Sequence, residues 1–184
     1  FRDGFRPTDI DTQSYLFPTD IARQTNTPAG YPLNWAGTSS RYGMTSSPTS
    51  YARAAGNPAF SSTEAEAAIK DSLASLPTLS IVTDRENLFN PTSGIYVNPR
   101  ARGQAWERPV SVELIHPDGS PGFQENAGMR MMGFSSRNVD FRKLHMRLLF
   151  KNQYGSGTLQ YPFFGEDRSD RINTIALRGN RRDA

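Results

Sequence analysis

The chain has 184 residues, of which 36% are hydrophobic and 11% aromatic, and its formal net charge at pH 7 is +3. This length fits one medium domain, or one domain with pieces of its neighbours. The absence of cysteine excludes disulfides, zinc–thiolate centres and cysteine nucleophiles. No apolar run approaches the roughly 20 residues of a membrane span, so we expect no span.

The positive charge is concentrated in the part of the chain after Ser136. Such an excess tolerates an anionic partner. It does not indicate nucleic acid, because the chain has no long Lys/Arg block, no zinc-finger spacing and no RNA-binding aromatic motif. We therefore expect no nucleic-acid partner, and a solvated basic face remains the simpler interpretation.

The first 60 residues carry few signals of regular structure. Thr12 to Phe17 alternate enough to predict a short terminal strand. Residues 18–60 are rich in Pro, Gly, Ser, Thr and Asn, and aromatic residues stand between them. This composition predicts a long irregular connector rather than helices.

One clear helix follows at residues 61–76. Ser61 and Glu64 have the spacing of a capping box, and Pro77 ends the helical pattern. Residues 78–83 are β-branched or apolar at nearly every position, which predicts a strand buried on both faces. Asp84 is expected to cap a short turn that extends through Asn87.

The remaining pattern is mainly that of strands. A tight turn at residues 90–94 leads into Ile95, Tyr96 and Val97. Further strands are predicted at Pro109–His116, Gly128–Met132, Leu144–Phe150 and Thr174–Leu177. Pro117 to Ser120 form a turn between the first two of these. The fold class is therefore α+β, a mainly antiparallel sheet with one clear helix and a long N-terminal connector.

The stretch MRMMGFSSRNVDFRK at residues 129–143 is the candidate binding site. Gly133 permits a close backbone approach, and Ser135 and Ser136 add hydroxyl groups to a turn whose N–H groups can hold an anion. Lys143 and Arg147 are four residues apart and share one face of the next strand. A strand, a small-residue turn and a returning strand with a lysine is the layout that covers nucleotide phosphates in protein kinases. A simple hairpin is the alternative.

The sequence gives little support for a metal site, a serine hydrolase or a catalytic pair of carboxylates. The histidines, His116 and His145, have no partner at metal-ligand spacing, so no metal site is expected. The chain has no Gly-x-Ser-x-Gly elbow. Nothing in the spacing of Glu107, Glu113 and Glu125 distinguishes them from ordinary strand residues.

Residues 77–179 resemble the N-terminal part of the CotH kinase family, the spore-coat protein H-like proteins. The motifs that carry the resemblance are LPTLSIVTDRENLFNPTSGIYVNP, WERPVSVELIHPDGSPGFQENAGMRMMGFSSR, RKLHMRLLFKNQYGSGTLQYPFFG and INTIALRG, in this order. The resemblance implies a kinase-like fold whose N-terminal lobe this sheet would form. It also implies ATP and Mg²⁺ as cofactors, and phosphorylation of serines in secreted or cell-surface proteins.

The family's motifs place the implied cofactor-binding residues. Its Gly-Gly-x-Ser-Arg pattern corresponds to residues 133–137, and its Lys-x-Ser-Phe-Arg strand to residues 143–147. The implied set is Gly133, Ser135, Ser136, Arg137, Lys143 and Arg147. The second glycine of the family is Phe134 here, and a bulky side chain at this position is expected to obstruct a close phosphate approach.

The resemblance also divides the chain. Residues 1–17 are similar to the closing strand of a chitobiase/β-hexosaminidase C-terminal-type sandwich, residues 18–60 are the connector, and 61–184 are the CotH-like part. The family's metal-binding and catalytic aspartates lie downstream and have no counterpart here, so we expect this polypeptide not to phosphorylate anything. It is expected to be a fragment of a secreted or cell-surface protein whose partners are neighbouring domains or a protein substrate. The alternative is a non-catalytic structural or binding module.

Overall fold

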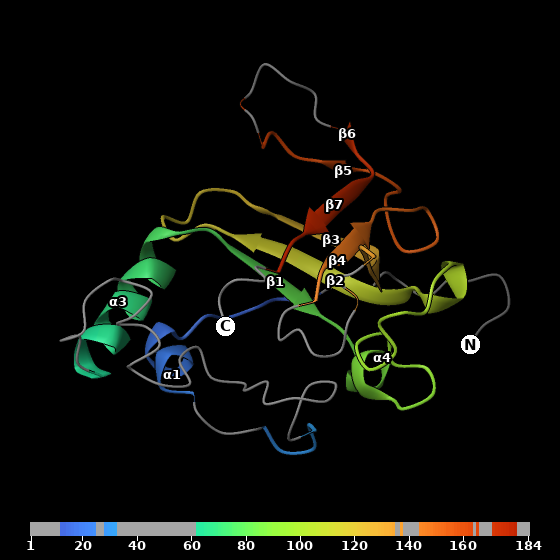
Figure 1. Ribbon diagram of the computed structural model, residues 1–184. Coiled ribbons are helices and arrows are strands. Elements are labelled where there is room, and N and C mark those ends of the chain that lie inside the picture. Colours follow the sequence, from blue (N-terminus) through green and yellow to red (C-terminus); the bar gives the residue numbers. More distant parts are fainter. Residues whose placement is uncertain are drawn as a thin grey trace, which may run out of the picture.

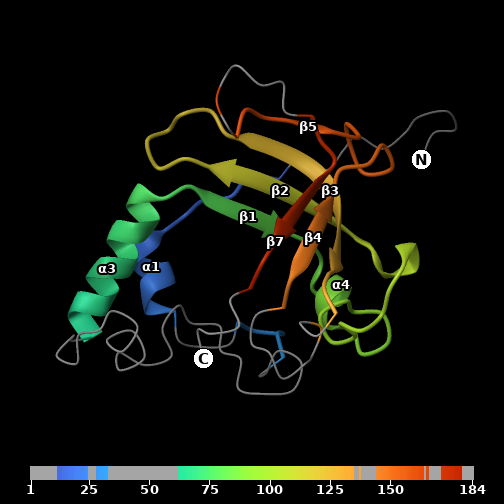
Figure 2. The same cartoon turned by 45° about the horizontal axis from the view of Figure 1, so that its top comes forward.

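The computed structural model describes residues 12–24, 28–32, 62–134, 137, 144–163, 165 and 171–179. Its centre is a five-stranded antiparallel sheet of order β1-β2-β3-β4-β7, which curls into a half-barrel (Figures 1 and 2). A second sheet contains two short strands, β5 and β6. The predicted α+β class with a mainly antiparallel sheet is confirmed.

The strands follow the alternating pattern of the sequence. The five-stranded sheet consists of β1 (Thr78–Val82), β2 (Arg108–Ile115), β3 (Phe123–Met131), β4 (Met146–Leu149) and β7 (Thr174–Leu177). The short pair consists of β5 (Leu159–Gln160) and β6 (Arg171–Ile172). The strand predicted from Gly128 begins five residues earlier, because Phe123 already pairs with Leu114 of β2. The turn between β2 and β3 contains Gly119 at a φ of 75°, as the Pro-Asp-Gly-Ser signal predicts.

The helices lie at the ends of the sheet (Figure 1). The predicted helix is α3 (Ser62–Ser75), and short helices form at α1 (Pro18–Arg23), α4 (Arg85–Phe89) and the 3₁₀ turn η1 (Gln104–Trp106). α1 lies beside α3, and Arg23 Nε contacts Glu66 Oε1 at 2.8 Å. The composition of residues 18–60 did not predict α1, which begins with a proline in the first turn, where proline is tolerated.

Two local predictions differ from the structure. β1 was predicted to be buried on both faces, but it is an edge strand of the five-stranded sheet and Val82 is 43% exposed. Asp84 is the N-cap of α4 without a hydrogen bond from its side chain. Ile95 and Tyr96, which follow the predicted tight turn, are buried.

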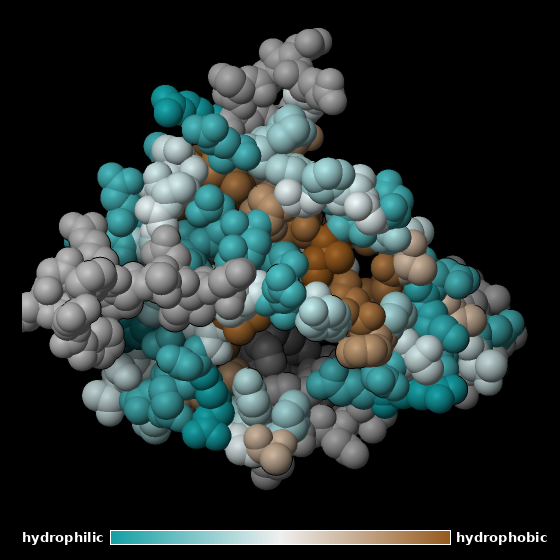
Figure 3. Space-filling view, turned by 180° about the vertical axis from the view of Figure 1, so that it is seen from behind, coloured by the Kyte–Doolittle hydropathy of each residue, from teal (hydrophilic) through white to brown (hydrophobic). Residues whose placement is uncertain are grey.

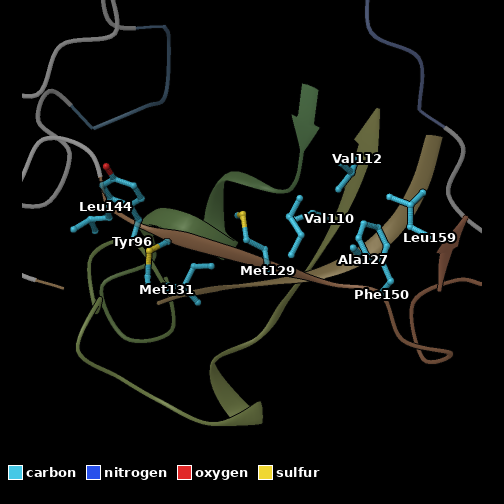
Figure 4. Close-up of a cluster of buried hydrophobic side chains, with 11 residues drawn as sticks. Tyr96, Val110, Val112, Ala127, Met129, Met131, Leu144, Phe150 and Leu159 are labelled. Atoms are coloured by element: carbon cyan, nitrogen blue, oxygen red, sulfur yellow. The ribbon is translucent and has the colours of Figure 1, made fainter. Parts of the chain in front are cut away.

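One face of the sheet forms the core. Because side chains alternate across a strand, the register places the apolar residues of β2, β3 and β4 on the same side. These residues are packed against side chains from the connecting segments (Figure 4), and the buried cluster contains Ile95, Tyr96, Val110, Val112, Ala127, Met129, Met131, Leu144, Leu148, Phe150 and Leu159. Burying a side chain of this kind contributes about 1.5–3 kcal/mol. Seen from behind, apolar residues remain visible in a band between polar regions (Figure 3).

The opposite face of the sheet is polar, and the N-terminal segment lies against part of it. Ser14 N donates to Glu113 Oε2 at 2.8 Å, and the Ser14 and Ser80 hydroxyls are 2.6 Å apart. Thr12 Oγ1 donates to Ser111 Oγ at 2.5 Å. Residues 12–17 therefore cross β1 and β2 through side-chain hydrogen bonds, and they do not form the predicted strand.

Candidate anion-binding site

Two arginines face each other at the far end of the polar face. The register of β3 and β4 pairs Arg130 with Arg147. Both are half-buried. Like charges directly opposite each other in a sheet are destabilising unless a counter-charge lies between or beside them. This position therefore favours a bound anion.

A third arginine approaches from the connection after β3. Arg137 Nη1 donates to the carbonyl of Ala101 at 2.9 Å. Arg137 Nε is buried and has no hydrogen-bond partner in the part of the chain that the structure describes. A buried donor without a partner costs free energy, which an anionic acceptor would recover.

The charges of these side chains act on one another. Burial lowers the pKa of the Arg137 guanidinium from its ordinary value, and the positive charges of three further arginines lower it too: Arg102, Arg130 and Arg147. The four side chains, Arg102, Arg130, Arg137 and Arg147, are called the arginine cluster below. Planar guanidinium groups bind phosphate and carboxylate through paired hydrogen bonds, so this set can hold an anion with several oxygens.

An exposed aromatic ring borders the cluster. The guanidinium carbon of Arg102 lies 5.8 Å from the ring centroid of Phe134, whose side chain is 87% exposed. Gly133 precedes it with a φ of 98°, a backbone conformation that favours glycine. The obstruction of a close phosphate approach by Phe134 stays a prediction.

A buried ion pair supports the same region. Lys151 Nζ lies 2.7 Å from Oε1 and 2.9 Å from Oε2 of Glu107, whose side chain has no exposed surface. Arg130 Nε is 3.7 Å from Glu107 Oε2. Burial raises the pKa of the Tyr154 hydroxyl, and its hydrogen bond with Glu107 raises this pKa further. Glu107 is thus held by Lys151 and is also within ion-pair distance of Arg130, so it offsets part of the positive charge of the arginine cluster.

Gly128 allows this pair to approach the sheet. A Cβ atom at Gly128 would lie 2.4 Å from Tyr154 Cε2 and 2.7 Å from Glu107 Oε1. Distances this short are not found between real side chains, so glycine is required for the observed arrangement. The missing side chain at Gly128 thus leaves room for Tyr154 and Glu107 against β3.

The structure brings together part of the predicted site. Arg137 and Arg147 belong to the arginine cluster, and Gly133 lies beside it. Ser135, Ser136 and Lys143 lie outside the described residues. Sequence reasoning missed Arg130, although the alternation of Met129, Arg130 and Met131 places Arg130 on the polar side when the methionines are buried.

The other missed residues come from distant segments. Arg102 reaches the cluster from a loop before η1, and Glu107 and Lys151 are 44 residues apart in the chain. Lys151 belongs to the basic part of the chain after Ser136, where nothing distinguishes it, and Glu107 is expected to be an ordinary strand residue. The local pattern around either residue contains no signal for this pairing.

The described residues fit phosphate better than a metal ion. No three His, Cys, Asp or Glu side chains gather in this part of the chain in a way that could hold a metal. The arginine cluster supplies donors for phosphate oxygens, whereas Mg²⁺ requires oxygen ligands such as carboxylates. The arginine cluster therefore fits the ATP phosphates that the resemblance implies. The described residues contain no set of carboxylates that fits the implied Mg²⁺.

Comparisons with protein-family models, with curated proteins and with solved structures find no match for this chain. Among the helices of the described segments, none is both long and apolar enough to cross a membrane. The function is therefore inferred from the residues themselves.

Proposed function

We propose that this chain binds the phosphate groups of a nucleotide at the arginine cluster, as the nucleotide-binding part of a secreted or cell-surface CotH-like protein. In this proposal the five-stranded sheet serves as the N-terminal lobe of a kinase-like fold. The observation that carries the proposal is the cross-strand pairing of Arg130 with Arg147, with Arg137 beside them. Guanidinium groups gathered at one place favour an anionic ligand with several oxygens.

The proposal covers binding and not phosphoryl transfer. Transfer needs carboxylates that hold Mg²⁺ and orient the attacking hydroxyl. In the part of the chain that the structure describes, the carboxylate found next to the cluster is Glu107, and Lys151 already occupies both of its oxygens. The order of the motifs supports descent from a CotH-like kinase. The residues of the arginine cluster support a role in binding.

Calorimetric titration of the 184-residue chain with tripolyphosphate and with ATP tests the proposal. We expect both ligands to bind, and we expect added salt to weaken binding because exposed charges are screened. Arg147→Gln is expected to lower both affinities by about tenfold or more, because a hydrogen bond to a charged group contributes about 1.5–3 kcal/mol.

Arg171→Gln is the matched control, because it removes the same charge from an exposed position in β6, outside the cluster. Its affinity should equal that of the parent chain. A folded chain that binds neither ligand, or an equal loss for the two variants, would contradict the proposal. The alternative is then a structural module, or a module that binds an acidic neighbouring domain.

A further inference from the structure

β1 has a free edge in the part of the chain that the structure describes. The sheet order places β1 beside β2 alone, at one end of the five strands (Figure 2). Natural proteins protect such edges with charged residues, prolines or bulges. β1 contains none of these, and no charged residue lies between Asp71 and Asp84 in the sequence. The sequence of β1 is therefore typical of a strand that has a neighbour on both sides.

The hydrogen bonds of the sheet show which backbone groups point toward this edge. In an antiparallel strand, the N–H and C=O of one residue point to the same side, and the side alternates along the chain. The carbonyl of Pro109 accepts from Thr83 Oγ1 at 2.7 Å, so the odd-numbered residues of β2 face β1. The register pairs them with the even-numbered residues of β1. Leu79 and Ile81 therefore direct their N–H and C=O groups outward.

The same parity follows from the other side of the sheet. Met132 N donates to the carbonyl of His145 at 2.9 Å, so the even-numbered residues of β3 face β4 and its odd-numbered residues face β2. The register of β2 and β3 then directs the odd-numbered residues of β2 toward β1. In the segments that the structure describes, the outward groups of Leu79 and Ile81 have no hydrogen-bond partner.

The side chains at this edge are incompletely covered. Leu79 and Ile81 pack against the core but stay partly exposed, whereas Val112, which lies opposite Ile81 in β2, is fully buried. Val82 is 43% exposed at the end of the strand. A strand added next to β1 would cover these apolar side chains and satisfy the outward backbone groups together.

We propose that β1 is the interface of a symmetric homodimer, in which the β1 strands of two copies pair antiparallel and continue one sheet across both. A pairing centred on Ser80 places Leu79 of one copy opposite Ile81 of the other, and these are the residues with outward N–H and C=O groups. Residues directly opposite each other lie on the same face, so the apolar faces of the two sheets become continuous. The twofold axis closes the assembly at two copies. This inference does not depend on phosphate binding.

The other edge strand, β7, fits this role less well. Arg171 precedes β7, Arg178 follows it, and Ala176 of β7 lies opposite Arg147 of the arginine cluster. Two β7 strands side by side would bring these positive charges together, which is unfavourable. Pairing of β1 with β7 of another copy would leave one edge free on each copy and continue into open chains. β1 paired with itself avoids both problems.

Sedimentation equilibrium of the 184-residue chain over a wide range of concentrations tests the proposal. We expect a monomer of 20.5 kDa in reversible equilibrium with a species of twice this mass. Because the strand is short, the dissociation constant should lie in the micromolar range. Thr78→Lys combined with Val82→Lys should raise it by about tenfold or more. Position 78 of one copy lies opposite position 82 of the other, so the introduced charges repel each other twice.

Two further variants separate this contact from a general effect of charge. Thr78→Lys combined with Val82→Glu places opposite charges across the interface, so it should restore the dimer and make its affinity sensitive to salt. Thr63→Lys combined with Ala67→Lys adds the same two positive charges at exposed positions of α3, in the half of the helix remote from β1. This control should leave the dissociation constant unchanged. Urea denaturation of dilute samples checks that each variant folds.

Amide hydrogen exchange of the parent chain tests the register without any substitution. The N–H groups of Leu79 and Ile81 should exchange more slowly as the concentration rises, while that of Ser80, which faces β2, should not change. The proposal is refuted if the parent chain is monomeric at every concentration, or if it forms species that grow beyond a dimer. Slower exchange in β7 in place of β1, or a dimer that Thr78→Lys with Val82→Lys does not weaken, would refute it as well.

Discussion

The Glu107–Lys151 pair makes a sharp prediction for Lys151→Met. This substitution keeps the length and the apolar stem of the side chain but removes its ammonium group. The ammonium nitrogen is 2.7 and 2.9 Å from the two oxygens of Glu107, whose side chain is fully buried. After the substitution, the Tyr154 hydroxyl keeps its hydrogen bond with Glu107, and the other remaining groups are Arg130 Nε at 3.7 Å and Gln153 Nε2 at 3.5 Å.

The expected cost follows from these distances. Removing one partner of a buried ion pair costs about 3–5 kcal/mol, because a charge remains buried without its counter-ion. Two features reduce the cost here: the Lys151 side chain is 36% exposed, and Arg130 remains nearby. We therefore expect Lys151→Met to lower the free energy of unfolding by about 2–3 kcal/mol. In a chain of this size, that corresponds to a decrease in Tm of about 4–12 °C.

Glu107→Gln provides the matched control. It removes the buried charge and keeps an oxygen that can accept from Lys151, whose partly exposed ammonium group remains hydrated. Its expected cost is only about 1 kcal/mol, the contribution of a typical hydrogen bond. The double variant should be more stable than Lys151→Met alone, because it no longer contains an orphaned carboxylate.

Urea denaturation measures these differences. Trp106 is next to Glu107 in the chain and belongs to the residues packed against the core, so its fluorescence should report unfolding of this region. Far-UV circular dichroism checks that the transition is cooperative. If Lys151→Met costs no more than Glu107→Gln, or if the double variant shows the sum of the two single effects, the argument from an orphaned charge is refuted.

Two further predictions concern the packing and the turn. Gly128→Ala should lower the free energy of unfolding by about 1–3 kcal/mol, because its Cβ would overlap Tyr154 Cε2 at 2.4 Å; an unchanged urea midpoint would contradict this. Hydrogen bonds from Ser120 lower the pKa of the Asp118 carboxyl below 3.8. The charged carboxylate therefore stabilises the folded state above pH 3.8, and this contribution is lost as the pH falls through the pKa of the folded state. Urea denaturation of the parent and of Asp118→Ala at several pH values tests this. The difference in their free energies of unfolding should be constant above about pH 5 and shrink below pH 3.8. A difference that does not change with pH would contradict the stabilising role of the Asp118 carboxylate.

Much of the site follows from one local rule, the alternation of side chains between the two faces of a strand. Alternation in β3 predicts that Arg130 points away from the core once Met129 and Met131 are buried, and the same rule applies to Arg147 beside Leu148. The Pro-Asp-Gly-Ser turn predicts the β2–β3 connection. These features depend only on neighbours in the chain, so the pattern contains them, although Arg130 was not among the predicted site residues.

The rest of the site depends on contacts between distant segments. No local signal brings Arg102 and Arg137 to the same end of the sheet, or Lys151 to Glu107 over 44 residues. Such contacts depend on the register of the whole sheet, and the alternation within one strand does not specify which strand lies beside it.

The sequence by itself determined the helix before Pro77, the positions of the main strands, the alternation of apolar residues in β2, and the basic part of the chain after Ser136. Only the tertiary structure decided that β1 lies at an edge, that Glu107 is buried against Lys151, and that four arginines converge beside an exposed Phe134. The physical reason is that local pattern fixes the direction of a side chain relative to its own strand, whereas burial and charge pairing depend on the neighbours that folding supplies.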